Sequence, residues 1–273
     1  MLKRLLRHKG AMIALAILTI IALIGIFAPF IAPNAPLKAN MMLKFATPTW
    51  DYPLGCDQLG RCILSRLIWG IRPTLGLAAL TMLGTMGLGL TVGLVSGYFR
   101  GWIDEVCMRL VDVLLSFPSQ IMVFAVIALL GVDVMNVVIA NIFIKWAWYA
   151  RMIRSNVIRY RTENFVNFSN VIGNSNSFIL VKHMLPSIAA ETAMLASLDM
   201  GWAIINISTL SFLGMGVQPP TPEWGAMLND AKQVFILNPM QMLAPGIAIV
   251  TVVSLFNALG DLIRDALDPK EVM

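Results

Sequence analysis

Three polar side chains interrupt long apolar runs of the sequence, and their types could bind a polar solute or an ion. Lys145 stands in the run 134–153, and Asp199 and Asn206 stand in the run 187–213. A charge at the centre of a bilayer costs about 2.5 to 3.5 kcal/mol, so these side chains are expected to face a bundle interior or water. We therefore take all three as candidates for a path across the membrane.

Lys145 and Asp199 are expected at similar depths. Counting about 1.5 Å of rise per residue from the cytosolic ends of their runs places them within one or two helical turns of each other. An interior ion pair is one interpretation, and separate contacts to backbone groups, water or a second subunit are the other. Glu191 lies in the same run as Asp199 and is expected to face the bundle interior or water for the same reason.

Catalytic chemistry has little support in this sequence. The two histidines, His8 and His183, are far apart, and there is no His-Glu-x-x-His pair, Gly-x-Ser-x-Gly elbow or Walker phosphate loop. We expect no catalytic residue and no metal site in this chain, and no cofactor bound by it.

Two of the three cysteines lie close together in the sequence. Cys56 and Cys62 are six residues apart in a segment expected outside the membrane, where oxidation can occur. A disulfide, two independent thiols and a soft-metal site completed by Met41 or Met42 are the three interpretations. Cys107 is expected to serve packing.

The composition places the elements around these residues in lipid. Hydrophobic residues make up 58% of the 273 residues and charged residues 13%, with a mean hydropathy of +0.77. An average soluble domain has about 25% charged residues. The net charge of +5 comes from Lys and Arg at the ends of apolar runs, as membrane orientation requires, so we expect lipid-bilayer contact and no nucleic acid.

Six apolar runs predict an all-α integral membrane protein built as a six-transmembrane-helix bundle. Each run is continuous and lacks the alternation of barrel strands. The third run is short, but 103–115 also reads as helix, with Pro118 placed to kink a longer helix or to begin a new one. The runs are 11–31, 74–98, 118–130, 134–153, 187–213 and 240–262.

The distribution of basic residues orients the bundle. The first run is too long for the apolar part of a signal peptide, about 7 to 15 residues, so it is expected to be retained as a helix. Most Lys and Arg fall on the cytosolic side if both termini lie there. The predicted parts are a cytosolic basic N-terminus 1–10 and a single transmembrane domain 11–273, with outer loops 32–73 and 214–239 and a cytosolic loop 154–186.

Two features of this layout predict packing. Arg61, Arg66 and Arg72 fall on the outer side against the charge rule, which suggests that their segment is folded against the protein or lies along the interface. In the second run, Gly89 and Gly93 belong to a four-residue glycine repeat that leaves one helix face nearly bare. Tight helix packing is the main interpretation of that face, and a pore or subunit interface is the other.

The cytosolic loop carries the motif that links this chain to a known family. Gly173 is followed thirteen residues later by Pro186, in the pair Leu185-Pro186. This spacing resembles the EAA loop of permease subunits of bacterial ABC importers. Asn167-Phe168-Ser169 stands where that loop has Glu-Ala-Ala, so docking here is expected to depend on shape more than on a charge.

Three further segments resemble the dipeptide, oligopeptide and nickel permease family. The segment 54–72 is similar to the Leu-Gly-Thr-Asp-x-x-Gly-Arg-Asp-x-x-Ser-Arg signature, with Cys56 and Cys62 in place of Thr and Asp. The segments 211–225 and 260–269 are also similar. The segments 146–155, 223–233 and 239–242 look more like nickel permeases than peptide permeases.

The resemblance implies an importer permease of the bacterial inner (plasma) membrane, working by alternating access. It implies a second homologous permease subunit, two cytosolic ATPase subunits that bind ATP and Mg, and an extracytoplasmic solute-binding protein. The substrate would be nickel as a chelate, or alternatively a dipeptide or oligopeptide. The alternative from another functional class is an ATPase-independent channel or a membrane enzyme. The implied coupling residues are Glu163, Asn167, Phe168, Ser169, Gly173, His183, Leu185 and Pro186.

Overall fold

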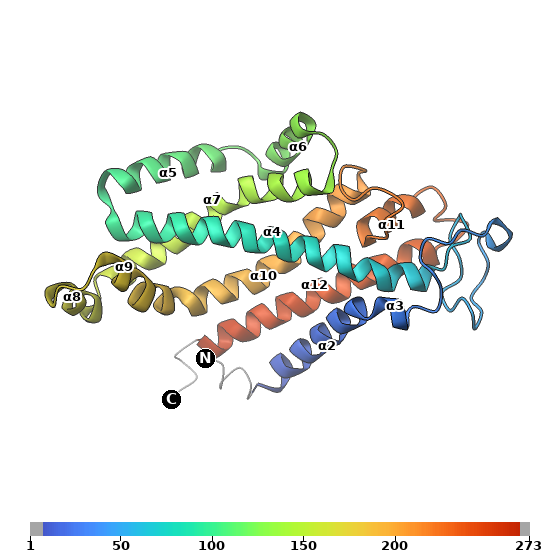
Figure 1. Cartoon of the computed structure of the whole chain (residues 1–273), viewed down its shortest axis with the longest axis horizontal. Coiled ribbons are helices and arrows are strands. Elements are labelled where there is room, and N and C mark those ends of the chain that lie inside the picture. Colours follow the sequence, from blue (N-terminus) through green and yellow to red (C-terminus); the bar gives the residue numbers. More distant parts are fainter. Residues whose placement is uncertain (1–7, 268–273) are drawn as a thin grey trace.

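The computed structural model describes residues 8–267, which form a bundle of long helices (Figure 1). Most of the basic N-terminal stretch, residues 1–7, and the last six residues lie outside the described part. The described residues contain no strand, as predicted, and only an isolated bridge between Cys56 and Cys62. In chain order the helices are α2 Lys9–Ile26, α3 Ala28–Ile31, η1 Met41–Leu43, α4 Ile63–Phe99, α5 Gly101–Leu115, α6 Ser119–Leu130, α7 Val134–Arg161, α8 Asn164–Val171, α9 Asn176–Ile179, η2 Leu180–Met184, α10 Leu185–Phe212, α11 Trp224–Ala231 and α12 Met240–Leu267.

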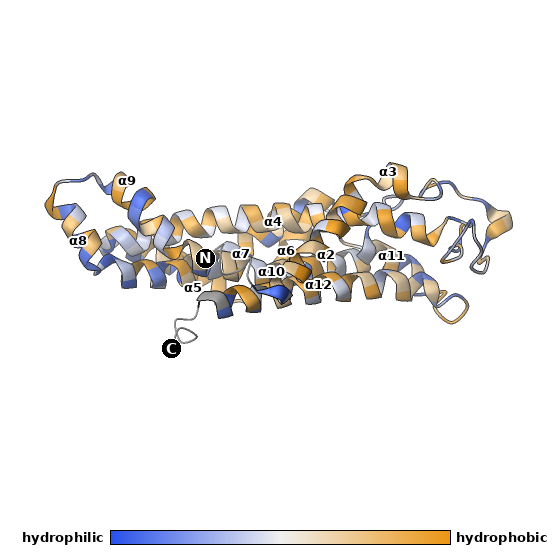
Figure 2. Ribbon diagram, turned by 90° about the horizontal axis from the view of Figure 1, so that it is seen from below, coloured by the Kyte–Doolittle hydropathy of each residue, from blue (hydrophilic) through white to orange (hydrophobic). Residues whose placement is uncertain are grey.

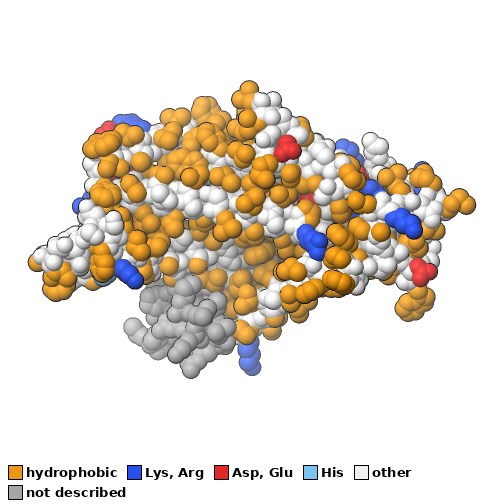
Figure 3. Space-filling view, in the orientation of Figure 1, with side chains coloured by type: hydrophobic (Ala, Val, Ile, Leu, Met, Phe, Trp, Pro, Cys, Tyr) orange, Lys and Arg blue, Asp and Glu red, His pale blue; other side chains and the backbone are white. Residues whose placement is uncertain are grey.

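By length and composition, four helical stretches could cross a membrane: Lys9–Ile26, Ile63–Phe99, Asn176–Phe212 and Met240–Asp265. The pair α5 and α6, bent by 88°, makes a fifth if it counts as one broken span. The predicted run 134–153 lies in the 28-residue helix α7, which is long enough but not among these stretches because its charged residues lower its apolarity. Hydrophobic side chains cover much of the molecule's face in Figure 3, with few charged ones between its two ends.

Several predicted boundaries were wrong because helix continues where polar residues suggested loop. α4 begins at Ile63, eleven residues before the predicted 74, and includes Pro73. The predicted outer loop 214–239 contains α11, and the predicted cytosolic loop 154–186 contains the end of α7, then α8 and α9. In each case local contacts satisfy the polar groups that a sequence reading assigns to water.

The break between α5 and α6 occurs where the sequence predicted it. α5 ends at Leu115, and Pro118 precedes the first residue of α6 as its N-cap. A proline disfavours helical geometry in the residue before it, so the chain leaves one helix and begins another. The 88° bend makes Pro118 a break rather than a gentle kink.

α4 and α7 pack closely along the glycine repeat. A Cβ built on Gly89 would lie 2.4 Å from the Cβ of Tyr149, and one on Gly93 would lie 2.8 Å from the carbonyl oxygen of Ala150. Contacts this short leave no room for a side chain, so the helix backbones approach where glycine allows it. The prediction of tight helix packing is confirmed.

The molecule has two distinct ends. The short helices α8 and α9 project at one end, while the irregular segment 32–62 and α11 lie at the other (Figure 1). Figure 2 shows hydrophilic residues at both ends and a largely hydrophobic stretch between them. The candidate functional residues therefore fall into three regions, one at each end and one between.

Candidate functional site

The middle region brings the predicted Lys145 and Asp199 together across two helices. Lys145 Nζ on α7 lies 3.5 Å from Asp199 Oδ2 on α10, and the two side chains are 19% and 17% exposed. The same Oδ2 accepts a 2.5 Å hydrogen bond from the hydroxyl of Tyr149, which is fully buried. The predicted interior ion pair is therefore present, with a tyrosine as a third member.

Two indole rings enclose the Lys145 ammonium. Its Nζ lies 4.0 Å from the ring centroid of Trp202 and 5.1 Å from that of Trp148. Cations are attracted to indole faces within about 6 Å, most strongly where water is scarce. The rings therefore stabilise a positive charge at a depth where it would otherwise be costly.

A cavity of about 110 Å³ opens beside Lys145, between α6, α7 and α10. Asn206, the third predicted candidate, lines it and donates from Nδ2 to Gln120 Oε1 at 3.1 Å. Asn141 also lines it, with 1% of its side chain exposed, and donates from Nδ2 to the carbonyl oxygen of Val137 at 2.8 Å. The Oδ1 atoms of Asn141 and Asn206 are buried without a hydrogen-bond partner.

Glu191 does not join this group. Its carboxylate accepts a hydrogen bond from Arg159 on α7, and the hydroxyl of Tyr160 lies 3.4 Å from the same oxygen. Arg159 is more than half exposed, so the pair lies toward the α8 end of the bundle. Of the two predicted surroundings, bundle interior or water, Glu191 lies nearer to water, where an exposed arginine on the neighbouring helix pairs with it.

At one end, α8 presents an apolar surface. Phe168 is 66% exposed and Val171 is 83% exposed, and Ile172, just after α8, is 58% exposed. Asn167 is turned back onto the chain, since its Nδ2 donates to the carbonyl oxygen of Thr162 at 3.2 Å. We name Phe168, Val171 and Ile172 the α8 apolar face.

The turn after α8 has a fixed geometry. Gly173 has φ +84°, a conformation that L residues with side chains rarely adopt, and a Cβ there would meet nothing within 4 Å. Asn174 donates to the hydroxyl of Ser169, which is 2% exposed, at 2.9 Å. Ser175 then caps α9 by accepting from the N–H of Phe178 at 3.3 Å. Glycine is thus required here by backbone conformation rather than by close packing.

The remaining predicted coupling residues lie around this turn. Glu163 is the exposed N-cap residue of α8, and its carbonyl oxygen accepts from the N–H of Asn167. The His183 ring packs between Phe165 and Phe178, at centroid distances of 5.9 and 5.6 Å. The structure therefore brings these predicted residues into one compact segment.

Leu185-Pro186 forms the first residues of α10, close to the predicted start of this run at 187, but no loop precedes α10. Helical structure runs from Asn176 to Phe212, with Leu180–Met184 as a π-helical turn immediately before α10. A proline inside a helix removes one backbone donor, and a wider turn accommodates the loss. The predicted coupling residues His183, Leu185 and Pro186 thus lie in the same continuous helical stretch as Asp199.

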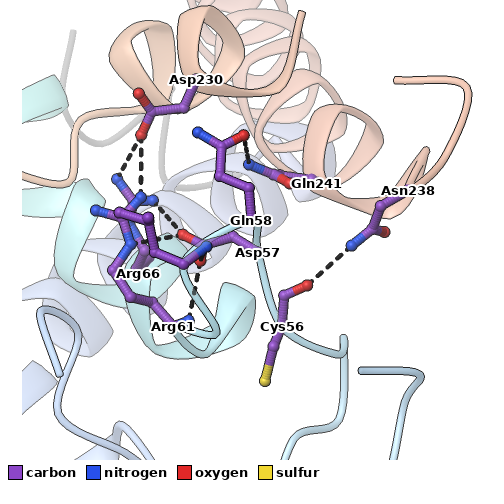
Figure 4. Close-up of polar contacts among 9 residues, drawn as sticks. Cys56, Asp57, Gln58, Arg61, Arg66, Asp230, Asn238 and Gln241 are labelled. Carbon is purple, nitrogen blue, oxygen red and sulfur yellow. Dashed lines mark hydrogen bonds and ion pairs between the residues drawn. The ribbon is translucent and has the colours of Figure 1, made fainter. Parts of the chain in front are cut away.

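At the opposite end, two arginines and two aspartates form a buried cluster (Figure 4). The Asp57 carboxylate accepts from Arg61 Nε and from Arg66 Nη1, both at 2.6 Å. Asp230, next to the last residue of α11, is reached by the same two guanidinium groups at 3.2 and 3.1 Å. The side chains of Asp57, Arg61 and Arg66 are all at most 5% exposed.

The cluster fastens the irregular outer segment to the helices. Gln58 contacts Gln241 at the start of α12 at 3.5 Å, and the carbonyl oxygen of Cys56 accepts from Asn238 at 2.8 Å (Figure 4). Arg72 donates to the carbonyl oxygen of Gly25 at 2.7 Å, near the end of α2. The expectation that the outer arginines are folded against the protein is confirmed.

The two outer cysteines are both free and buried. Burial, together with the charges of Cys62 and Asp57, raises the pKa of Cys56 to about 11. Met41 and Met42 have exposed side chains, so neither is buried with the thiols. Of the three interpretations, the arrangement matches two independent thiols.

The residues that the sequence did not predict are uncharged side chains around the predicted charged ones. Tyr149 lies four residues after Lys145, one helical turn away, so its spacing could have indicated a shared face. Trp202 and Asn141 carry no such signal, since an indole or amide in an apolar run reads as packing. Within residues 8–267, no group of three or more His, Cys, Asp and Glu side chains is placed to hold a metal ion.

Two family descriptions match the chain. Residues 89–272 match the binding-protein-dependent transport system inner membrane component, and residues 1–48 match the N-terminal TM domain of oligopeptide transport permease C.

Three curated proteins illustrate the range of the relatives. The metal-staphylopine import system permease protein of Staphylococcus aureus is 42% identical over 98% of this chain and 93% of that protein. The nickel transport system permease protein of Escherichia coli is 38% identical over 94% and 93%. The dipeptide transport system permease protein of Alkalihalophilus pseudofirmus is 37% identical over 98% and 88%.

Proposed function

The chain belongs to the family of binding-protein-dependent transport system inner membrane components and is a permease subunit of an ABC importer of the peptide and nickel group; on this premise we propose that it imports nickel as a chelate. Two of the three relatives described above are named for metal or nickel transport, which favours a metal-bearing solute. A dipeptide is the second candidate, favoured by the relative named for dipeptide transport.

The observation that carries the chelate proposal is the chemistry of the buried cavity. Its polar groups are one ammonium, three amides, a hydroxyl and two indole N–H groups, and no histidine or cysteine is among its lining residues. Nickel ions favour imidazole and other nitrogen ligands, and a lysine ammonium repels a bare cation. A chelator that supplies the metal's ligands and adds carboxylates of its own would suit this lining.

We propose that α7 is the sixth span, beside the four apolar helices and the α5–α6 pair. Its buried face packs on α4, and Lys145 is compensated by Asp199 on α10, which supports placing both charges within the bundle. Alternating access would then move a polar region between two openings, with both termini in the cytosol. The proposed partners are a second homologous permease, two ATPase subunits and an extracytoplasmic solute-binding protein.

The segment 154–186 is proposed to dock an ATPase subunit. The α8 apolar face supports this role, because exposed apolar side chains at a polar end of a membrane protein favour a protein contact. The backbone turn at Gly173 fixes how α8 projects, and helical continuity to Phe212 would carry its movement toward Asp199. ATP and Mg would bind the ATPase subunits.

Uptake by the assembled transporter tests the proposal. The complex would be reconstituted in vesicles with its binding protein, and labelled nickel uptake measured with competing free nickel, nickel chelates and dipeptides. We expect ATP-dependent uptake that chelates inhibit more than free metal or dipeptides. Inhibition by dipeptides alone would favour the second candidate, and uptake that survives inactivation of the ATPase would indicate a channel instead.

A further inference from the structure

The cavity beside Lys145 holds a buried acceptor that lacks a donor. Asn141 is 1% exposed, and its Nδ2 is committed to the carbonyl oxygen of Val137, so the atom left unpaired is its Oδ1. A carbonyl oxygen cannot donate, which fixes this orientation of the amide. Leaving such an acceptor dry costs about 1–3 kcal/mol, so the site favours a ligand that brings N–H groups.

The same cavity has a cation that can change partners. Tyr149 holds Asp199 Oδ2 at 2.5 Å, whereas Lys145 Nζ is 3.5 Å from that oxygen. The ammonium is thus the more loosely held partner, and it already lines the cavity. If Lys145 turned to a ligand, Asp199 would keep the tyrosine hydrogen bond.

An oxygen that lacks a hydrogen-bond donor and an ammonium that can change partners together indicate the chemical class of the solute. We propose that this cavity binds the amino-carboxylate part of the solute, with the carboxylate on Lys145 and amine N–H groups donating to Asn141. The inference rests on the importer function proposed above and adds to it a substrate class and a binding site.

The size and walls of the cavity agree with a group of this kind. A cavity of about 110 Å³ holds roughly four waters, taking about 30 Å³ for each, which is room for a small group such as an amine next to a carboxylate. The indoles of Trp148 and Trp202 offer flat apolar walls for carbon atoms of the solute. A whole peptide or chelate would extend beyond this chain, toward the second permease subunit.

The test compares solutes that differ only at the carboxylate, using the complete transporter in vesicles. The probes are labelled alanyl-alanine against its C-terminal amide, and labelled nickel with histidine against nickel with histamine, which is histidine without its carboxylate. For each pair, the ratio of ATP-dependent uptake rates is measured in the wild type and in Lys145→Met. We expect the wild type to prefer the carboxylate form in at least one pair, and the variant to lose about tenfold or more of that preference.

Two further variants separate this inference from a structural role of the ion pair. Lys145→Met with Asp199→Asn leaves no unpaired charge and keeps an acceptor for Tyr149, so it is used for the same ratios if the single variant fails to assemble. Lys232→Met is the matched control, because that lysine is exposed outside the cavity, and its ratio should equal the wild-type value.

The possible results are distinct. An unchanged ratio in the lysine variants means that the binding protein alone discriminates, and it overturns the inference. An equal fall for both members of each pair points to a structural role and overturns it as well. No ATP-dependent uptake of any probe by the wild type would contradict the proposed function itself.

Discussion

Replacing Asp57 by Asn is expected to destabilise the outer end of the protein strongly. The Asp57 carboxylate accepts two guanidinium hydrogen bonds of 2.6 Å, and its other oxygen accepts from the N–H of Leu59 at 2.9 Å. An Asn side chain has nearly the same shape and keeps one acceptor oxygen, but it carries no charge. The substitution therefore removes the charge from the cluster and turns an NH2 group toward two of the N–H donors that the carboxylate now satisfies.

The size of the expected loss of stability follows from the ion pairs that remain after the substitution. Arg61 and Arg66 are 5% and 2% exposed, and after the change both depend on Asp230 alone, at 3.2 and 3.1 Å. Removing one partner of a buried ion pair costs about 3–5 kcal/mol because the other charge stays buried without compensation. We expect the free energy of unfolding to fall by that amount.

The assay is unfolding of the purified protein in mixed detergent micelles by increasing dodecyl sulfate, followed by circular dichroism. The control is Asp51→Asn, an exposed aspartate in the same segment, which should change the free energy of unfolding by less than about 0.5 kcal/mol. Adding Arg61→Met to Asp57→Asn removes one uncompensated charge and should restore part of the loss. A loss under about 1 kcal/mol in Asp57→Asn would refute the reasoning.

Three other predictions concern packing, the coupling turn and the outer thiol. Gly93→Val places a side chain where a Cβ would be 2.8 Å from the carbonyl oxygen of Ala150. We expect it to lower the free energy of unfolding by about 1–3 kcal/mol in the same assay. Gly87→Ala, which has open space around it, should not lower it. Gly173→Val forces a β-branched residue to φ +84° and should reduce ATP-dependent uptake while membrane insertion stays normal. Gly173→Asn tolerates that conformation better and should retain more uptake. Equal uptake by the two variants would contradict the role of the turn. Cys56 stays a thiol up to about pH 11 in the folded protein, so iodoacetamide at pH 8 should label it only after unfolding, as peptide mass spectrometry would detect; prompt labelling of the folded protein would contradict its burial.

The sequence offered the central ion pair as one of two interpretations, because depth can be counted along a helix. Lys145 and Asp199 lie in separate apolar runs, and the rise per residue placed them at similar depths before any contact was known. The partner of Arg61 and Arg66 was not predictable in this way. Asp230 lies more than 160 residues away, and only tertiary packing brings it there.

Errors in the helix boundaries share a physical cause. The first turns of α4 contain Arg66, and polar residues there suggested a loop, although burial with Asp57 and Asp230 makes them compatible with a packed helix. Pro186 was taken as the start of a span, but the π-helical turn before it lets the helix pass through. The residue propensities indicated where a helix could end, and tertiary contacts determine where each helix does end.

In the transporter proposed above, the continuous helix α4 would act as a lever between the two ends of the bundle. Its 37 residues extend about 55 Å at 1.5 Å each, well beyond the roughly 30 Å of hydrocarbon. Its first turn holds Arg66 of the outer cluster, and near its other end Tyr98 donates to Asn176 of α9 at 2.9 Å. A tilt of about 5° around its midpoint would shift each end by roughly 2.4 Å in opposite directions. A torque applied at the end that holds this cluster would therefore reach the segment proposed to dock an ATPase subunit through one helix.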